Sequence, residues 1–198
     1  MSDTLTSAFW YLSRGTGVVT LLLLTLVVAL GIATRSGRPL PGLPRFAVAA
    51  VHRSSSLLTL VFLAIHVGTL MFDKWAQLKL VDLLVPFQGT YRPLWLGLGT
   101  LASDLLIALV ITSLIRLRLG PGTWRAIHWT AYAAWPVALL HGLGTGSDAG
   151  QVWMWAAGAL SIITVALAVG WRVSDSFDRN PATVTLPRYP RSYQEVQR

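Results

Sequence analysis

The chain has 198 residues, of which 54% are hydrophobic and only 12% carry a charge. A soluble domain usually has about 25% charged residues, so the composition excludes an ordinary soluble domain and also a disordered chain. Cysteine is absent, which excludes disulfides, thiolate metal sites, iron–sulfur clusters and thiol redox chemistry. The net charge is +8, but the cations lie in short clusters between apolar runs. This pattern indicates membrane topology, and no nucleic-acid partner is expected.

Five apolar stretches are long enough to cross the roughly 30 Å hydrocarbon core of a bilayer. They predict membrane helices at residues 9–34, 47–72, 93–116, 124–144 and 151–172. The first stretch lacks a basic start and exceeds the apolar part of a signal peptide, so we expect it to remain as a helix. Backbone polar groups in lipid must be satisfied within each segment, which favours helices. The predicted fold class is all-α, a polytopic membrane helix bundle of about five transmembrane helices.

Basic residues are distributed unevenly between the predicted loops, and in membrane proteins they concentrate on the cytoplasmic side. One side has three, Lys74, Lys79 and Arg92, and the other has twelve. The twelve are Arg35, Arg38, Arg45, Arg53, Arg116, Arg118, Arg125, Arg172, Arg179, Arg188, Arg191 and Arg198. We therefore predict that the N-terminus lies outside and the C-terminus in the cytoplasm, with residues 173–198 as a short disordered tail. The arginine-rich, lysine-poor usage is typical of a GC-rich bacterial source, and the expected location is the inner (plasma) membrane.

All four histidines fall in two of the five predicted helices. The second helix carries His52 and His66, and the fourth carries His128 and His141, at spacings of H-x13-H and H-x12-H. These helices run in the same direction, so His52 and His128 are expected near the cytoplasmic face. The other two are expected near the outer face, about 20 Å away at 1.5 Å per residue. Ionisable residues inside a membrane are costly and are therefore candidates for function.

Two imidazoles at each of two depths are typical of bis-histidine ligation of two b-type haems. A zinc site is disfavoured, because zinc needs three or four ligands around one ion. A single haem remains an alternative, as does a haem-free transporter or scaffold in which the histidines relay protons or bond neighbouring carbonyls. An ideal helix would also aim His141 about 140° away from His128. We expect a kink at Pro136 to re-aim His141.

With these features the sequence resembles the ferric reductase-like transmembrane domain family. That superfamily includes ferric reductases, NADPH oxidases and the haem subunit of the bacterial methionine sulfoxide reductase system. The resemblance covers about residues 9–172, so residues 1–172 are taken as one haem-binding membrane domain. It rests on the paired histidines and on three strings: His52-Arg53, Tyr91-Arg92-Pro93-Leu94-Trp95 and the run from Trp124 to Tyr132.

The resemblance implies transmembrane electron transfer, with His52 and His128 as axial ligands of an inner haem b and His66 and His141 of an outer one. Many relatives have six helices, and oxidase-type relatives carry a cytosolic flavin and nicotinamide domain. Here five helices are expected, and the short tail has no Gly-rich phosphate loop, so we expect no FAD or NADPH site.

The chain would then be the haem-bearing subunit of a membrane oxidoreductase. Its electron donor would be a cytoplasmic flavin partner protein or a quinol. Its acceptor would be extracytoplasmic: ferric iron, a flavoprotein or a periplasmic reductase.

Five further residues are candidates for a role in the same site. Arg53 and Arg92 are expected to pair with haem propionates, the alternative being charge bias or solvated loop ends. Arg14 and Asp104 are embedded in the first and third helices, and a lone charge is costly there. They are expected to pair with each other, or Arg14 is expected to contact the outer propionates while Asp104 handles protons or a quinone. A protonated, hydrogen-bonded Asp104 with a purely structural use is a further alternative. Trp135 lies about midway between the two histidine levels and is a candidate for the electron path or for simple packing.

Overall fold

The structure is a computed structural model that describes residues 3–72, 78–145, 148–174 and 177. These residues form helices and no strand, which confirms the predicted all-α class. The helices are α1 (Asp3–Ser36), α2 (Arg45–Leu70), the 3-10 helix η1 (Leu80–Leu83), α3 (Pro93–Leu114), α4 (Arg116–Leu119), α5 (Pro121–His128), α6 (Ala131–Thr145) and α7 (Val152–Val173). Within the described ranges, α1, α2, α3 and α7 are long and apolar enough to cross a membrane. The predicted tail, 173–198, lies almost wholly outside the described residues.

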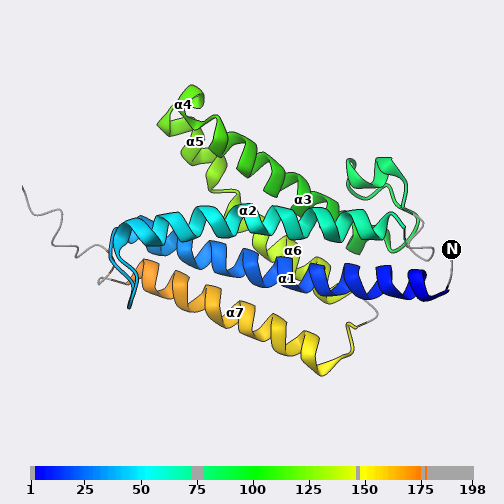
Figure 1. Ribbon diagram of the computed structural model, residues 1–198. Coiled ribbons are helices and arrows are strands. Elements are labelled where there is room, and N and C mark those ends of the chain that lie inside the picture. The colour runs from blue at the N-terminus through cyan, green and yellow to red at the C-terminus, as the bar shows by residue number, and fades with distance from the viewer. Residues whose placement is uncertain (1–2, 73–77, 146–147, 175–176, 178–198) are drawn as a thin grey trace, which may run out of the picture.

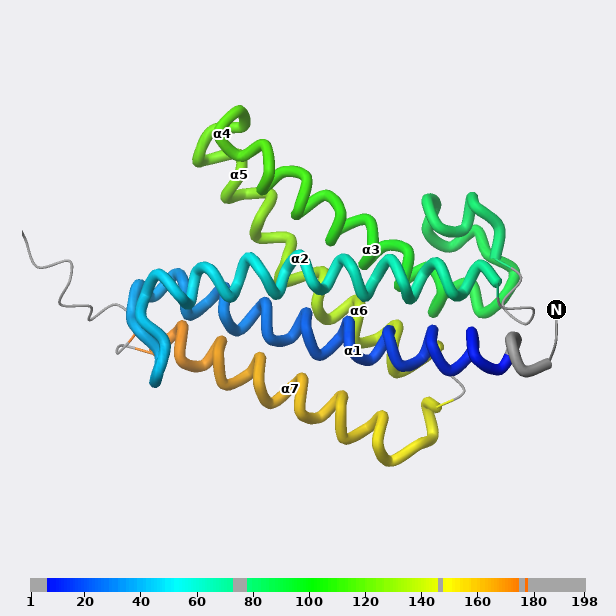
Figure 2. The backbone as a smooth tube through the Cα atoms, in the orientation of Figure 1, coloured from blue at the N-terminus to red at the C-terminus, as the bar shows by residue number. Residues whose placement is uncertain are grey.

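Helix α1 lies at the centre of the bundle and contacts α2, α6 and α7. Helix α2 runs antiparallel to α1 along one side, and α7 lies along another (Figure 1). Helix α3 packs mainly on α6, with few contacts to α2. The end of α3 that leads into α4 lies away from α2, as the backbone trace shows (Figure 2). The bundle is therefore tight around α1 and more open between α2 and α3.

A tight turn sets α1 and α2 side by side. The turn is formed by Leu40, Pro41, Gly42 and Leu43, and Leu40 and Leu43 exchange main-chain hydrogen bonds of 3.0 and 2.9 Å. Gly42 has a φ of 74°, a backbone conformation that favours glycine. Proline followed by glycine at the two central positions is the sequence signature of a type II turn. The local sequence thus reverses the chain and makes the two helices antiparallel.

Hydroxyl groups along α1 are satisfied within the helix itself. Thr16 donates to the carbonyl of Leu12 at 2.6 Å, Thr20 to that of Thr16 at 2.7 Å, and Thr25 to that of Leu21 at 2.8 Å. A hydroxyl that donates to the carbonyl one helical turn earlier avoids the free-energy cost of an unpaired polar group in an apolar environment. For this reason α1 can be buried at the centre of the bundle although it contains buried threonines.

The predicted helix at 124–144 is wrong as a single helix, because the chain breaks at Trp129 and Thr130, between α5 and α6. Here main-chain hydrogen bonds reach three residues back along the chain, whereas those of an α-helix reach four. The N–H of Thr130 donates to the carbonyl of Ile127 at 3.0 Å, and that of Ala133 to the carbonyl of Thr130 at 2.9 Å. The Thr130 hydroxyl also donates to the carbonyl of Ile127, at 2.8 Å, and so competes with the main-chain ladder. Pro136, where we expected the kink, lies inside α6.

Arg172, in the last turn of α7, ties that helix to the break between α5 and α6. Its Nη1 donates a hydrogen bond to the Tyr132 hydroxyl. The guanidinium also lies 5.1 Å from the ring centroid of Trp129 and 5.3 Å from that of Tyr132. From sequence, Arg172 was assigned only a part in the charge bias. Its contacts depend on the docking of α7, which no local pattern predicts.

Arg172→Ala is expected to lower the free energy of unfolding by about 1–3 kcal/mol. The change removes a hydrogen bond from a charged donor and a cation–π contact. Thermal unfolding in detergent, followed by circular dichroism, measures the effect. Arg116→Ala, at an exposed position on α4, is the control and should stay within about 0.5 kcal/mol of the parent. An equal loss of unfolding free energy in both variants would mean that Arg172 contributes to stability only through its charge.

Candidate functional site

The four histidines meet in two pairs, each with one ring from α2. His52 faces His128, the last residue of α5, with ring centroids 6.5 Å apart and ring planes at 78°. His66 faces His141 of α6, with centroids 6.3 Å apart and planes at 77°. The structure therefore brings together the residues that the sequence assigned to a common depth. Within the described residues, no three His, Cys, Asp or Glu side chains gather around one point. The site consists of two separate pairs.

The spacing within each pair suits a metal ion between the two rings. A metal–nitrogen bond of about 2 Å, with the ring centroid about 1.1 Å beyond the nitrogen, places the centroids of two opposed imidazoles about 6.2 Å apart. A direct hydrogen bond of about 2.9 Å between ring nitrogens would instead place the centroids about 5 Å apart. The measured 6.5 and 6.3 Å match the first arrangement. The rings are thus too far apart to bond each other.

Three of the four rings direct Nδ1 at a main-chain carbonyl oxygen of a neighbouring helix. They are His52 with Val27 at 3.1 Å, His66 with Ser13 at 2.6 Å, and His141 with Trp95 at 2.8 Å. Because a carbonyl only accepts, Nδ1 must carry the proton, and Nε2 is left with a free lone pair. Metal-binding histidines commonly make this bond, which fixes the tautomer and the orientation of the ring. The bonds to carbonyls therefore give these three imidazoles the tautomer that metal-binding histidines commonly have.

His128 is held differently from the other three. Its Nδ1 is buried and has no hydrogen-bond partner in the described part of the chain. The ring instead stacks on Trp124, with centroids 4.9 Å apart and planes at 25°. Trp124 in turn donates from Nε1 to the Ser113 hydroxyl on α3, at 3.3 Å. The position of His128 thus depends on an aromatic stack.

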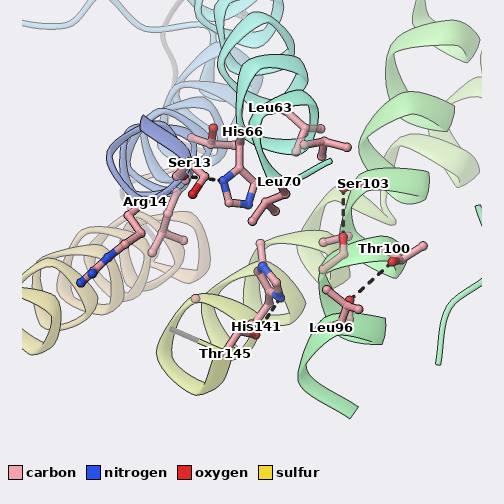
Figure 3. A pocket seen from close by; sticks show the side chains of 18 of the residues that line it. Ser13, Arg14, Leu63, His66, Leu70, Leu96, Thr100, Ser103, His141 and Thr145 are labelled. Carbon is pink, nitrogen blue, oxygen red and sulfur yellow. Dashed lines mark hydrogen bonds between the residues drawn. The ribbon is translucent and has the colours of Figure 1, made fainter. Parts of the chain in front are cut away.

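A cavity of about 1210 Å³ surrounds His66 and His141. Both side chains line it, one from α2 and one from α6 (Figure 3). The walls are mostly apolar, with a few hydroxyl groups such as those of Thr100 and Ser103. Ligand pockets are commonly about 300–1,000 Å³, so this cavity has room for a large flat ligand between the rings.

Arg14 and Asp104 do not pair with each other. Arg14 forms an ion pair with Asp148, which follows α6, and both side chains line the cavity. The Arg14 guanidinium also lies 3.8 Å from the ring centroid of Trp10. Asp104 is half-buried on α3 and has no hydrogen-bond or ion-pair partner among the residues that the structure describes. The sequence missed Asp148 as the partner because it lies far along the chain from Arg14.

The two arginines assigned to propionates lie in different settings. Arg92 precedes α3, and its Nη1 donates to the carbonyls of Gly144 at 3.0 Å and Thr145 at 3.2 Å. It therefore caps the C-terminal end of α6, the helix that carries His141. Arg53 is exposed next to His52 on α2. Pairing with a propionate stays a prediction for both.

Trp135 packs against an apolar cluster between the two levels. Its Nε1 donates to the Thr25 hydroxyl on α1 at 3.0 Å. The cluster consists of Leu24, Leu63, Leu106, Leu109 and Ala134. Leu63 lies between the two histidines of α2, and Ala134 lies between His128 and His141. Buried apolar side chains thus lie between the two pairs.

Asp148→Ala is expected to lower the free energy of unfolding by about 1–3 kcal/mol, because it leaves the Arg14 guanidinium unpaired in a partly buried position. Arg14→Leu should have a similar cost. The double variant should cost less than the two single changes together, since it leaves neither charge without its partner. Thermal unfolding in detergent of the parent, the two single variants and the double variant measures this double-mutant cycle. Strictly additive costs would show that the two side chains are not coupled.

Comparison with known proteins places the site in context. A family model described as the ferric reductase like transmembrane component matches residues 16–139, more than half of the chain. The matched segment contains His52, His66 and His128 and ends two residues before His141. No curated protein and no solved structure in the comparisons matched the chain.

Proposed function

This chain belongs to the ferric reductase-like transmembrane family, and we propose that it carries electrons across a membrane through two b-type haems. The observation that carries the proposal is the geometry of the histidine pairs. At both levels the two imidazoles have the separation of ligands on opposite sides of one metal, 6.5 and 6.3 Å between centroids. Ferric reductase-like domains bind haem, which favours haem iron over other metals.

The residues present fit this cofactor. His52 and His128 would hold the inner haem, and His66 and His141 the outer one, each offering a neutral imidazole. The cavity of about 1210 Å³ with mostly apolar walls supports a macrocycle at the outer level. When bound, haem iron supplies reversible one-electron redox chemistry, whose potential is tuned by the protein around it.

The protein has three tasks in this scheme. The carbonyls of Val27, Ser13 and Trp95 orient their imidazoles and increase the basicity of the ligating nitrogen. The apolar cluster around Leu63 and Ala134 excludes water from the space between the levels. Helices α1 and α3 hold the rings of α2 and α6 in place, so that the gap between paired rings persists.

The proposed topology has five crossings, with α5 and α6 together forming the fourth. It places the N-terminus outside and the C-terminus in the cytoplasm of a bacterial plasma membrane, supported by the uneven distribution of arginine. A cytoplasmic flavin protein or a quinol would supply electrons, and an extracytoplasmic acceptor would take them. The chain would then be the haem subunit of a membrane oxidoreductase.

Haem content tests the proposal directly. Protein purified in detergent should contain two haems per chain and show a reduced-minus-oxidised spectrum of b type. His52→Ala or His128→Ala should remove one haem, and His66→Ala or His141→Ala the other. Leu58→Ala, at a lipid-exposed position on α2, is the control and should keep both. A well-folded parent protein without haem would contradict the proposal and favour a haem-free transporter or scaffold.

Electron transfer across vesicles tests the transmembrane path. Proteoliposomes that enclose ferricyanide should lose its colour when dithionite, which does not cross the bilayer, is added outside. A variant that lacks either haem should be inactive, because both levels are needed to span the membrane. Leu58→Ala should be as active as the parent. Undiminished transfer after the loss of one level would rule out a path through both.

A further inference from the structure

The same local arrangement occurs beside three of the four histidine rings. Each ring bonds, through Nδ1, the carbonyl that lies four residues before a glycine of the neighbouring helix. The sets are Ser13 and Gly17 for His66, Val27 and Gly31 for His52, and Trp95 and Gly99 for His141. In an α-helix that carbonyl already accepts the N–H of the glycine. The imidazole donates to the same oxygen, and the Ser13 carbonyl also accepts from the Thr16 hydroxyl at 3.1 Å.

Each ring occupies the space that a side chain at the glycine would need. A methyl group on Gly99 would lie 2.5 Å from Cε1 of His141, and one on Gly17 would lie 2.9 Å from Cε1 of His66. On Gly31 the corresponding distance to His52 is 3.3 Å. Carbon atoms in ordinary contact are about 3.5–4.0 Å apart. Glycine therefore leaves room for the imidazole to lie against the helix and reach the carbonyl, and this room is tightest at Gly99 and Gly17.

The spacing of two of these glycines matches the spacing of the histidines. Gly17 and Gly31 are 14 residues apart on α1, as His52 and His66 are on α2. Because the two helices are antiparallel, one register brings both glycines opposite both rings. Helix α1 thus contacts one proposed ligand at each level although it carries no histidine itself.

We propose that Gly17, Gly31 and Gly99 are positioning residues that fix three of the proposed haem ligands before haem binds. The inference rests on the proposed function. Each glycine opens a carbonyl to Nδ1, and the bond to that carbonyl would leave Nε2 free to bind the haem iron. The outer level has two such positions, for His66 and His141. The inner level has one, for His52.

Replacement of each glycine by alanine tests this role. Gly99→Ala and Gly17→Ala should remove the outer haem and leave the inner one. Gly31→Ala should act on the inner haem only, and more weakly because the added methyl group has more room; Gly31→Val should remove that haem. The measurements are haem per chain and the low-spin electron paramagnetic resonance signal of each haem. Gly15→Ala and Gly170→Ala, where a methyl group meets open space, are the matched controls.

The possible outcomes separate the inference from the proposed function. Alanine favours helix more than glycine does, so a weaker helix cannot explain haem loss. The haem retained at the other level also reports that the bundle has folded. Two haems with unchanged spectra in all the glycine variants would overturn the inference alone, and so would equal loss from both levels. A parent protein without haem would overturn the proposed function and the inference together.

Discussion

The gap between the paired imidazoles is the constraint on which the rest of this structure depends. At 6.5 and 6.3 Å between centroids, the two rings of a pair do not bond each other. Something else must hold them, because an unrestrained histidine would turn toward any acceptor within reach. Carbonyls of α1 hold the rings of α2, and a carbonyl of α3 holds that of His141. The central helix carries no histidine, yet it determines where two of the proposed ligands lie.

Polar groups elsewhere in the bundle help to keep that frame rigid. Arg92 caps α6 at its C-terminal end, and Arg172 joins the end of α7 to the break between α5 and α6. Arg14 and Asp148 link α1 to the segment after α6. Arg92 and Arg172 make their contacts at helix ends, and Arg92 bonds main-chain carbonyls that lack partners within α6. Together they fix the helices whose separation determines the gap between the rings.

The sequence predicted most of the fold because hydropathy is a local property. The helices at 47–72, 93–116 and 151–172 agree with α2, α3 and α7 to within a few residues. The break at Thr130 was missed, because a hydropathy profile does not detect a threonine hydroxyl that competes for a main-chain carbonyl of the helix. The partner of Arg14 was missed because it depends on how distant segments dock. The bonds from Nδ1 to α1 also required the register of two helices, although the matching spacing of Gly17 and Gly31 was visible in the sequence.

The difference between the two levels follows from the spacing of the histidines themselves. On α2, the H-x13-H spacing keeps both rings within about 40° of one face of a straight helix. The H-x12-H spacing would aim His128 and His141 about 140° apart, so a straight helix cannot present both rings to α2. The chain breaks between them, and the break leaves His141 on α6, next to α3, while His128 ends the separate helix α5. His141 therefore keeps a carbonyl partner, whereas His128 depends on its stack with Trp124. The break between α5 and α6 thus lets both rings face α2 despite the H-x12-H spacing, and it leaves the two levels unequally supported.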